Sequence, residues 1–358
     1  MTLTKAKKKP GLRWLKITAI VLAALLLLFT AATIVVAVIM GQQFGRADYP
    51  SQQVSMNYLY AHYESDYPRE NISFTSGENT LRGYIYGADN DKALLVFAHG
   101  IGSGHESYMK SLLWFVDNGW RVFTYDATGS GHSEGAGTKG LPQSALDLDA
   151  ALDYIEADPE LSAMPKFLMG HSWGGYAVTA VLNFGHKVDG VASVAGYAVP
   201  LEMIYEFAGQ MIGGAKVIAY PSMWLYNRLL FGEYAGLSAV DGINGTDVPV
   251  LIIHGTADKT IAYDGAAIMH KRDLITDPNA EYLTLEGCSH NGMFDTPGAI
   301  VIKQDIKDKV GEMVKQGESK DNAYAAVNPT ADLDAANQPN DEFLSQIEDF
   351  FEEILDNK

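Results

Sequence analysis

The chain has few of the residues that cross-link a protein or bind a metal. Only one of its 358 residues, Cys288, is a cysteine, so no intramolecular disulfide can form. Its nine histidines show no clustering with metal-ligand spacing, and no G-x-x-x-x-G-K-[ST] phosphate loop or internal repeat is present. We therefore expect neither a metal ion nor another cofactor.

Acidic residues are missing from the first 47 residues, which hold seven basic ones. The rest of the chain carries all 44 acidic residues, and the formal net charge is −18. A body this acidic repels nucleic acid and anionic lipid headgroups. We expect neither as a ligand of the folded part.

Charges are also absent from Ile17 to Met40, a run of 24 residues. As a helix this run would be about 36 Å long, enough to cross a hydrocarbon core of about 30 Å. Trp14 and several basic residues precede it, as is typical of the cytoplasmic end of a spanning helix. We expect 1–16 to be a cytoplasmic tail, 17–40 a transmembrane helix, and the folded domain that follows to lie on the outer face. A cleaved signal peptide is the alternative, although its apolar region is usually only about 7–15 residues long.

Residues 41–68 form a juxtamembrane linker that contains five tyrosines. These tyrosines fit either a bilayer interface or packing against the domain, and the pattern does not decide between the two. Past residue 69, apolar runs alternate with helical patterns, which predicts a mostly parallel α/β sheet. The runs expected as strands are 71–76, 81–86, 93–98, 121–125, 166–169, 188–194, 250–253 and 282–285.

Two stretches interrupt this alternation within the domain of residues 69–358. Residues 201–247 are rich in aromatics and methionine and predict a helical cap. Residues 317–340 are polar and predict a loop or a partly disordered insertion. An apolar stripe at helical spacing then predicts a terminal helix over 341–356, capped by Asn340 or Asp341.

The motif Gly170-His171-Ser172-Trp173-Gly174 lies between an expected strand and an expected helix. In that setting G-x-S-x-G predicts a nucleophile elbow, a tight turn that exposes the serine hydroxyl above the sheet. Ser172 is therefore the candidate nucleophile. The helix that follows adds unpaired N–H groups and a positive dipole end, both of which favour an anion.

A nucleophilic serine needs a base and an acid that orients the base. Asp258 follows the expected strand 250–253, and His290 lies in the loop after the last expected strand, so their order after Ser172 fits. Asp264 is the alternative acid, although it resembles the cap of a helical segment.

An oxyanion formed on Ser172 would need two backbone donors. One is the N–H of Trp173, directly after the nucleophile. The other is the N–H of Ile101, in the glycine-rich loop His99-Gly100-Ile101-Gly102-Ser103-Gly104 after the expected strand 93–98.

These motifs together resemble the α/β-hydrolase superfamily. The matching segments are FAHGIGSG (97–104), DATGSGHS (126–133), GHSWGG (170–175), VPVLIIHGTADKTI (248–261) and CSHNG (288–292). The resemblance is to the branch of monoacylglycerol-lipase-like, serine aminopeptidase S33 and Bem46-like proteins. It implies an eight-stranded sheet with a cap after the sixth strand. It also implies hydrolysis of an ester, amide or thioester through an acyl-enzyme. The membrane anchor and the length of 294–340 depart from the usual pattern.

We expect a membrane-anchored serine hydrolase that cleaves a lipophilic acyl ester, as carboxylesterases or monoacylglycerol lipases do. An aminopeptidase, an amidase or an acyltransferase could use the same triad. A catalytically idle receptor or scaffold is the alternative from another class, although a complete triad argues against it.

The cap of residues 201–247 follows a core strand, so it is placed to overhang the crevice where α/β folds bind ligands. Its Phe207, Met211 and Trp224 are candidates for the lining of an acyl pocket above Ser172. The alternative is that these apolar faces pack on each other and on the sheet.

Overall fold

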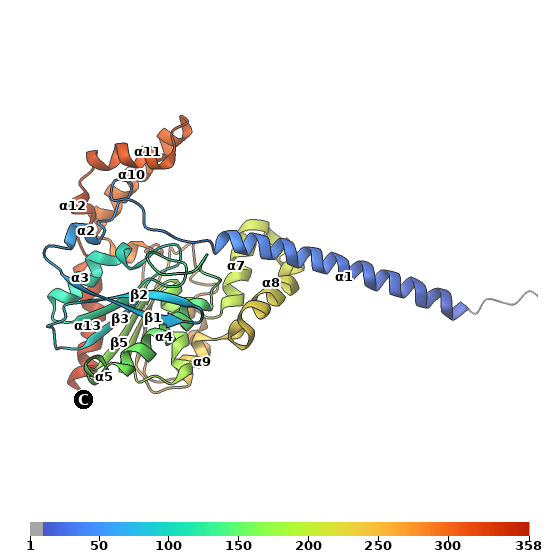
Figure 1. The fold of residues 1–358 in the computed structure, drawn as a ribbon, viewed down its shortest axis with the longest axis horizontal. Helices are drawn as coiled ribbons and strands as arrows, with labels where there is room; N and C mark the ends of the chain where they lie inside the picture. Colours follow the sequence, from blue (N-terminus) through green and yellow to red (C-terminus); the bar gives the residue numbers. More distant parts are fainter. Residues whose placement is uncertain (1–9, 358) are drawn as a thin grey trace, which may run out of the picture.

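The computed structural model describes residues 10–357, so the first nine residues of the expected cytoplasmic tail lie outside it. Its centre is an eight-stranded sheet with the order β1-β2-β4-β3-β5-β6-β7-β8. The pairs β1–β2 and β2–β4 are antiparallel and all others are parallel. The expected mostly parallel α/β architecture is confirmed (Figure 1).

All eight expected strands form. They are β1 (Arg69–Ser76), β2 (Asn79–Tyr86), β3 (Leu94–Ala98), β4 (Arg121–Tyr125), β5 (Lys166–His171), β6 (Gly190–Val194), β7 (Val250–Gly255) and β8 (Ala280–Leu285). The longer helices are α1 (Pro10–Gln43), α3 (Met109–Asp117), α4 (Gln143–Ala157), α6 (Trp173–Ala180), α7 (Pro200–Ile212), α8 (Lys216–Phe231), α10 (Pro297–Lys315), α11 (Lys320–Val327) and α13 (Asp341–Asp356). The shorter ones are α2 (Tyr60–Tyr63), α5 (Pro159–Ala163), α9 (Ala239–Asn244) and α12 (Leu333–Ala336).

Helices cover both faces of the sheet, as its doubly apolar strands require. Side chains of α4, α6 and α9 pack in one core cluster, whereas those of α3 and α13 pack in another on the opposite face. Helix α13 confirms the expected terminal helix, and the side chain of Asn340 caps it by accepting from the N–H of Phe343. Its Phe343, Ile347 and Phe351 are buried.

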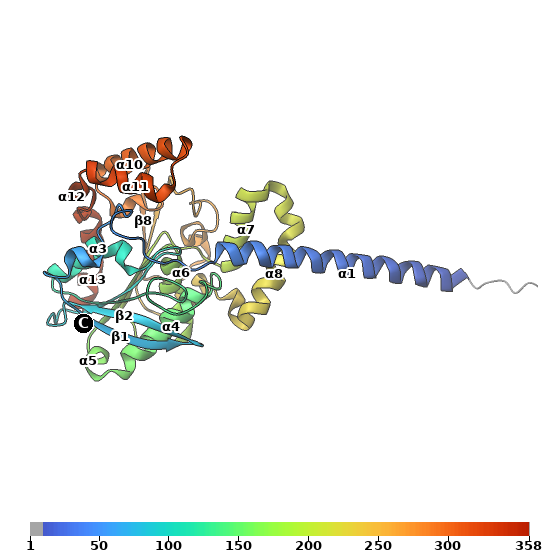
Figure 2. The same cartoon turned by 45° about the horizontal axis from the view of Figure 1, so that its top comes forward.

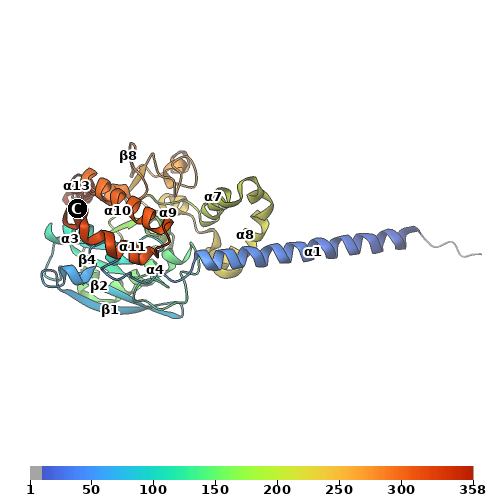
Figure 3. The same cartoon turned by 90° about the horizontal axis from the view of Figure 1, so that it is seen from above.

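Helix α1 extends away from the sheet, and its C-terminal end lies against the cap helices α7 and α8 (Figures 1 and 3). The stretch Arg13–Gln43 is long and apolar enough to cross a membrane. Near its end, Thr33 Oγ1 lies 3.2 Å from Ser222 Oγ of α8. Val36, Ile39 and Met40 face Phe207 and Met211 of α7 across a small apolar cavity of about 60 Å³.

Residues 44–60, within the expected linker, are bound to the domain along their length. Arg46 donates to the carbonyls of Gly131, Ser133 and Gly135 at 2.6, 2.8 and 3.1 Å. The hydroxyl of Tyr49 donates to the buried carboxylate of Asp126. The sequence does not decide whether the linker tyrosines lie at a bilayer interface or pack on the domain, and in this segment they pack on the domain. For example, Tyr60 stacks under the guanidinium of Arg69 at 3.6 Å.

The polar stretch 317–340 folds into α11 and α12, so the expectation of a loop is wrong there. These helices and α10 form a small cluster of their own around Ile306, Val310 and Val327. Residues 53–58 are held on it, because Asn337 Nδ2 donates to the carbonyl of Met56 at 3.0 Å. Figures 1 and 2 show this group apart from α7 and α8, at the top of the domain, whereas α7 and α8 lie at its right.

Candidate active site

Ser172 occupies a sharp turn between β5 and α6. Its φ of 58° and ψ of −111° lie in a region that non-glycine residues rarely adopt. The flanking glycines make the turn possible. A Cβ at Gly170 would lie 2.3 Å from the carbonyl oxygen of Gly174, and one at Gly174 would lie 1.9 Å from that of Ala98. The G-x-S-x-G motif thus forms the strand–turn–helix that it predicts.

Three side chains from separate loops meet at this turn. Asp258 follows β7 and His290 follows β8, so both lie at the carboxyl edge of the sheet with Ser172. His290 Nε2 lies 2.9 Å from Ser172 Oγ, and His290 Nδ1 lies 2.6 Å from Asp258 Oδ2. A carboxylate only accepts, so Nδ1 carries the proton and Nε2 accepts from the serine hydroxyl.

The surroundings of Asp258 keep its carboxylate ionised. Burial alone would raise its pKa, but hydrogen bonds from His254 and His290 hold the pKa well below its usual value. The N–H groups of Thr260 and Ile261 also donate to it, at 2.8 and 3.0 Å. The alternative acid Asp264 is exposed to solvent.

The loop that holds Ile101 is braced by a chain of three hydrogen bonds. The N–H of Gly100 donates to Tyr108 Oη at 3.1 Å, and the Tyr108 hydroxyl donates to His171 Nδ1 at 2.8 Å. His171 Nε2–H then donates to the carbonyl of His290 at 2.9 Å. Burial lowers the pKa of His171 to about 3, so the ring is neutral and can both donate and accept. This chain joins the loop before α3 to the backbone of His290.

Within residues 10–357, neither the N–H of Ile101 nor that of Trp173 donates to a protein acceptor. Trp173 begins α6, where unpaired N–H groups and the helix dipole favour an anion. Two free donors beside Ser172 are what an oxyanion requires.

A cavity of about 450 Å³ opens over Ser172. Its inner wall is formed by the loop 100–103 and His290, which the sequence places at the site, and by Tyr108, which no motif indicates. Its outer wall comes from two other segments, Met56 and Asn57 before the sheet and Lys303 and Lys307 on α10. No motif marks these outer residues, and only the unusual length of 294–340 indicated that the rim would differ.

The cap residues are not where the sequence predicted them. Phe207, Met211 and Trp224 do not line the Ser172 cavity. Phe207 and Met211 face α1, and Trp224 lines a separate hollow beside Asn227. The reason is that the apolar face of the cap meets α1, the most apolar helix in the described chain.

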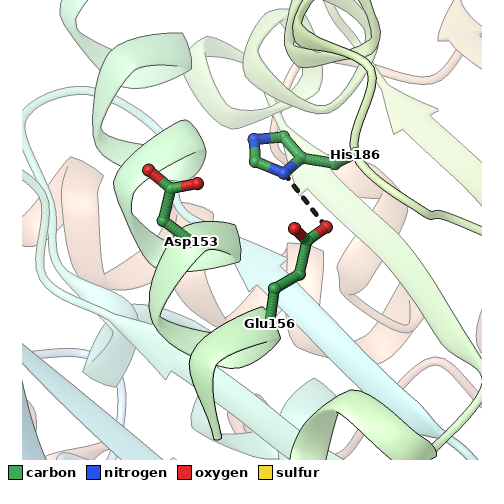
Figure 4. Close-up of side chains that lie close together, drawn as sticks. All are labelled: Asp153, Glu156 and His186. Atoms are coloured by element: carbon green, nitrogen blue, oxygen red, sulfur yellow. Dashed lines mark hydrogen bonds and ion pairs between the residues drawn. The ribbon is translucent and has the colours of Figure 1, made fainter.

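One cluster outside the site has ligand atoms close enough together for a metal ion. Those of Asp153, Glu156 and His186 lie within 4.8 Å of one another (Figure 4). Both ring nitrogens of His186 already have partners, Asp149 at 2.8 Å and Glu156 at 3.1 Å. The hydrogen bond with Asp149 raises the pKa of His186, which favours an ion-pair network. We assign no metal site to it.

Comparison with known proteins gives matches over much of the domain. Residues 89–232 match the family model "Serine aminopeptidase, S33". The uncharacterised protein YfhR of Salmonella typhi is 28% identical over 209 residues, which are 54% of this chain and 66% of that protein. The non-heme chloroperoxidase of Streptomyces lividans is 25% identical over 267 residues, 62% of this chain and 93% of that protein.

The esterase Pf2001 of Pyrococcus furiosus has a similar structure. It superposes with a TM-score of 0.51 at 19% identity, over 73% of this chain and 96% of the esterase. At that identity the likeness concerns the fold, and it agrees with the sheet order described above. The chain therefore has the α/β-hydrolase fold, and its residues 89–232 are similar to the S33 serine aminopeptidase family, as the resemblance of its motifs implies.

Proposed function

We propose that the chain is a serine hydrolase that cleaves an acyl ester with Ser172 as its nucleophile. The observation that carries the proposal is the pair of hydrogen bonds through His290, 2.9 Å to Ser172 Oγ and 2.6 Å to Asp258. Distances of this kind between nucleophile, base and orienting acid are what proton transfer during acyl transfer requires.

In the first half-reaction, Ser172 Oγ attacks the acyl carbonyl carbon while His290 Nε2 takes the hydroxyl proton. The negative charge on the carbonyl oxygen is held by the N–H groups of Ile101 and Trp173. The intermediate then collapses, and the leaving alkoxide departs with the proton from His290. A water molecule repeats the sequence on the acyl-enzyme and releases the acid.

The lining of the cavity favours an ester over the N-terminal residue of a peptide. An aminopeptidase must hold the substrate's α-ammonium, which calls for an unpaired carboxylate near the nucleophile. The one carboxylate among the lining residues, Asp295, is already paired with Lys110 and Lys303 at 2.5 and 2.8 Å.

We further propose that α1 anchors the enzyme in a membrane, with its N-terminus in the cytoplasm and the catalytic domain outside. Support comes from the exposed apolar side chains along its length, such as Leu27 and Ile34. Helix α8, which packs against α1, also exposes apolar side chains, because Ile218 and Leu229 are 84% and 73% exposed. High salt should therefore leave the full chain in the membrane fraction, whereas detergent should release it. Release by salt alone would contradict the anchor.

The catalytic proposal is tested by Ser172→Ala in the full chain, purified in detergent. We expect hydrolysis of p-nitrophenyl esters to fall by about 10⁴–10⁶ and labelling by a fluorophosphonate probe to disappear. The matched control is Ser289→Ala, an exposed serine next to His290, which should keep both signals. Unchanged turnover in Ser172→Ala would overturn the assignment.

A further inference from the structure

The cavity over Ser172 carries more positive than negative charge. Apart from its two histidines, the charged side chains that line it are three lysines, Lys110, Lys303 and Lys307, and one carboxylate, Asp295. The whole chain has a formal net charge of −18, so the local charge of the cavity has the opposite sign to that of the chain. A local excess of the opposite sign concentrates counter-charged ligands in a cleft.

Two of these lysines share one carboxylate oxygen. Lys110 Nζ and Lys303 Nζ lie 2.5 and 2.8 Å from Asp295 Oδ1. Their other acceptors are uncharged, the carbonyl of Gln338 for Lys110 and Asn57 Oδ1 for Lys303. One negative charge thus faces two positive ones, with side chains only 9%, 11% and 13% exposed. Burial of an uncompensated charge costs free energy, which a bound anion would recover.

One polar side chain that lines the same cavity has no hydrogen-bond partner. Ser111 is 1% exposed and lines the cavity, yet its Oγ makes no hydrogen bond within the described part of the chain. Buried hydroxyls of folded proteins are normally hydrogen-bonded. Lys307, on the exposed side of α10, also has no ion pair within residues 10–357. An unpaired hydroxyl and an unpaired ammonium thus border the same space as Ser172.

We propose that this wall binds an anionic group of the substrate. The substrate class is an acyl ester with a carboxylate or phosphate some bonds away from the scissile carbonyl. The proposal rests on the proposed hydrolase function and deepens it. Lys303 and Lys307 supply the charge, and Ser111 donates a hydrogen bond to the anion. The same wall repels cationic substrates, such as choline esters or a free α-amine.

The test compares esters that differ only in charge, using the full chain in detergent. One pair places the charge on the acyl side, p-nitrophenyl hydrogen glutarate against p-nitrophenyl methyl glutarate. The other places it on the leaving group, 3-acetoxybenzoate against 3-acetoxybenzamide. In at least one pair we expect the anionic ester to have a kcat/KM about tenfold higher, which corresponds to one well-formed ion pair. The preference should shrink between low and high salt.

Lys307→Gln should lower the ratio of anionic to neutral kcat/KM by about fivefold, and Ser111→Ala should lower it less. Lys309→Gln is the matched control, since this lysine is on the same helix, pairs with Asp305 and does not line the cavity. It should leave the ratio unchanged. Lys303→Met is a second variant for the buried charge, checked for folding by thermal unfolding.

The outcomes separate the two proposals. If the neutral esters are hydrolysed in a Ser172-dependent manner but neither pair shows an anionic preference, the anion site is wrong and the hydrolase stands. A preference that survives both lysine variants, or a faster reaction with an acylcholine, would also overturn the anion site. If hydrolysis does not depend on Ser172, the hydrolase proposal itself fails.

Discussion

The cap (201–247) and the long segment 294–340 contribute to the Ser172 cavity differently from what their sequences predict. The cap is apolar and follows a core strand, yet its helices α7 and α8 pack against α1 and do not line the Ser172 cavity. The segment 294–340 carries no motif and is only longer than is usual for the fold, yet its helix α10 forms the outer wall of that cavity. The difference teaches that an apolar face packs against the most apolar partner available, which here is α1. The space over the nucleophile is left to a more polar element.

The largest expected effect tests where the catalytic centre lies. Asp258→Asn should lower kcat by about 10⁴, because it removes the charge that orients His290. Asp264→Asn should change kcat by less than threefold. Asp264 lies in the loop 262–266, whose N–H groups bind Glu206 of the cap. A larger loss in Asp264→Asn, measured on p-nitrophenyl esters, would move the centre under the cap and reverse the comparison.

The second effect concerns stability. Tyr49→Phe removes a hydroxyl that donates to the buried carboxylate of Asp126, and we expect the free energy of unfolding to fall by about 1.5–3 kcal/mol. Tyr67→Phe is the control, because its bond to Asp117 is exposed and should be worth less than about 1 kcal/mol. Denaturant unfolding in detergent measures both. Equal losses would mean that residues 44–60, which carry Met56 to the cavity, are only loosely held.

A third experiment sets a rim residue directly against a cap residue. Met56→Ala should lower kcat/KM for the best p-nitrophenyl ester, in a series from acetate to decanoate, by about three- to tenfold. The reason is that Met56 lines the cavity and each buried methylene is worth about 0.8 kcal/mol. Trp224→Ala should leave the series within about twofold of the wild type. The opposite ranking would restore the cap as the acyl-chain selector.

The smallest expected effect is on pH dependence. Burial lowers the pKa of Lys110, and the nearby charge of Lys303 lowers it further. Tyr108, Asp295, Lys303, Lys307, His171 and His290 are the other titratable groups of the cavity. As the pH rises through this lowered pKa, Lys110 loses its positive charge.

The preference for the anionic ester should therefore decline by a few-fold before the pH reaches about 10.4, the ordinary lysine value. It is read as the ratio of the two kcat/KM values, so that effects on the shared chemistry cancel. In Lys110→Met the ratio should be smaller and flatter over the same range. A wild-type ratio that is constant up to pH 10 would mean that the charge of Lys110 does not contribute to the preference for the anionic ester.

Most of the sheet and the inner half of the site could be predicted from the sequence, because their signals are local. Buried strands show as apolar runs, and the turn at Ser172 needs glycines at fixed offsets. The rim could not be predicted this way. Asn57 and Lys303 bond across 246 positions of the chain, and no period or motif indicates such a pair. The apolar stripe of α7 predicts that this helix packs against another element, but the stripe does not indicate that the element is α1.

The three carbonyls held by Arg46 have a mechanical consequence. They hold the segment just after α1 on the turn 131–135, which restricts bending between α1 and the domain. In a chain anchored through α1, the mouth of the cavity then keeps one orientation relative to α1. The remaining freedom is the tilt and rotation of α1 in the bilayer and the lateral diffusion of the whole molecule. The cavity would then stay at a fixed distance from α1 while the molecule moves in the bilayer. Lengthening the chain between Gln43 and Arg46 would change that distance only if Arg46 also lost its hydrogen bonds to the three carbonyls.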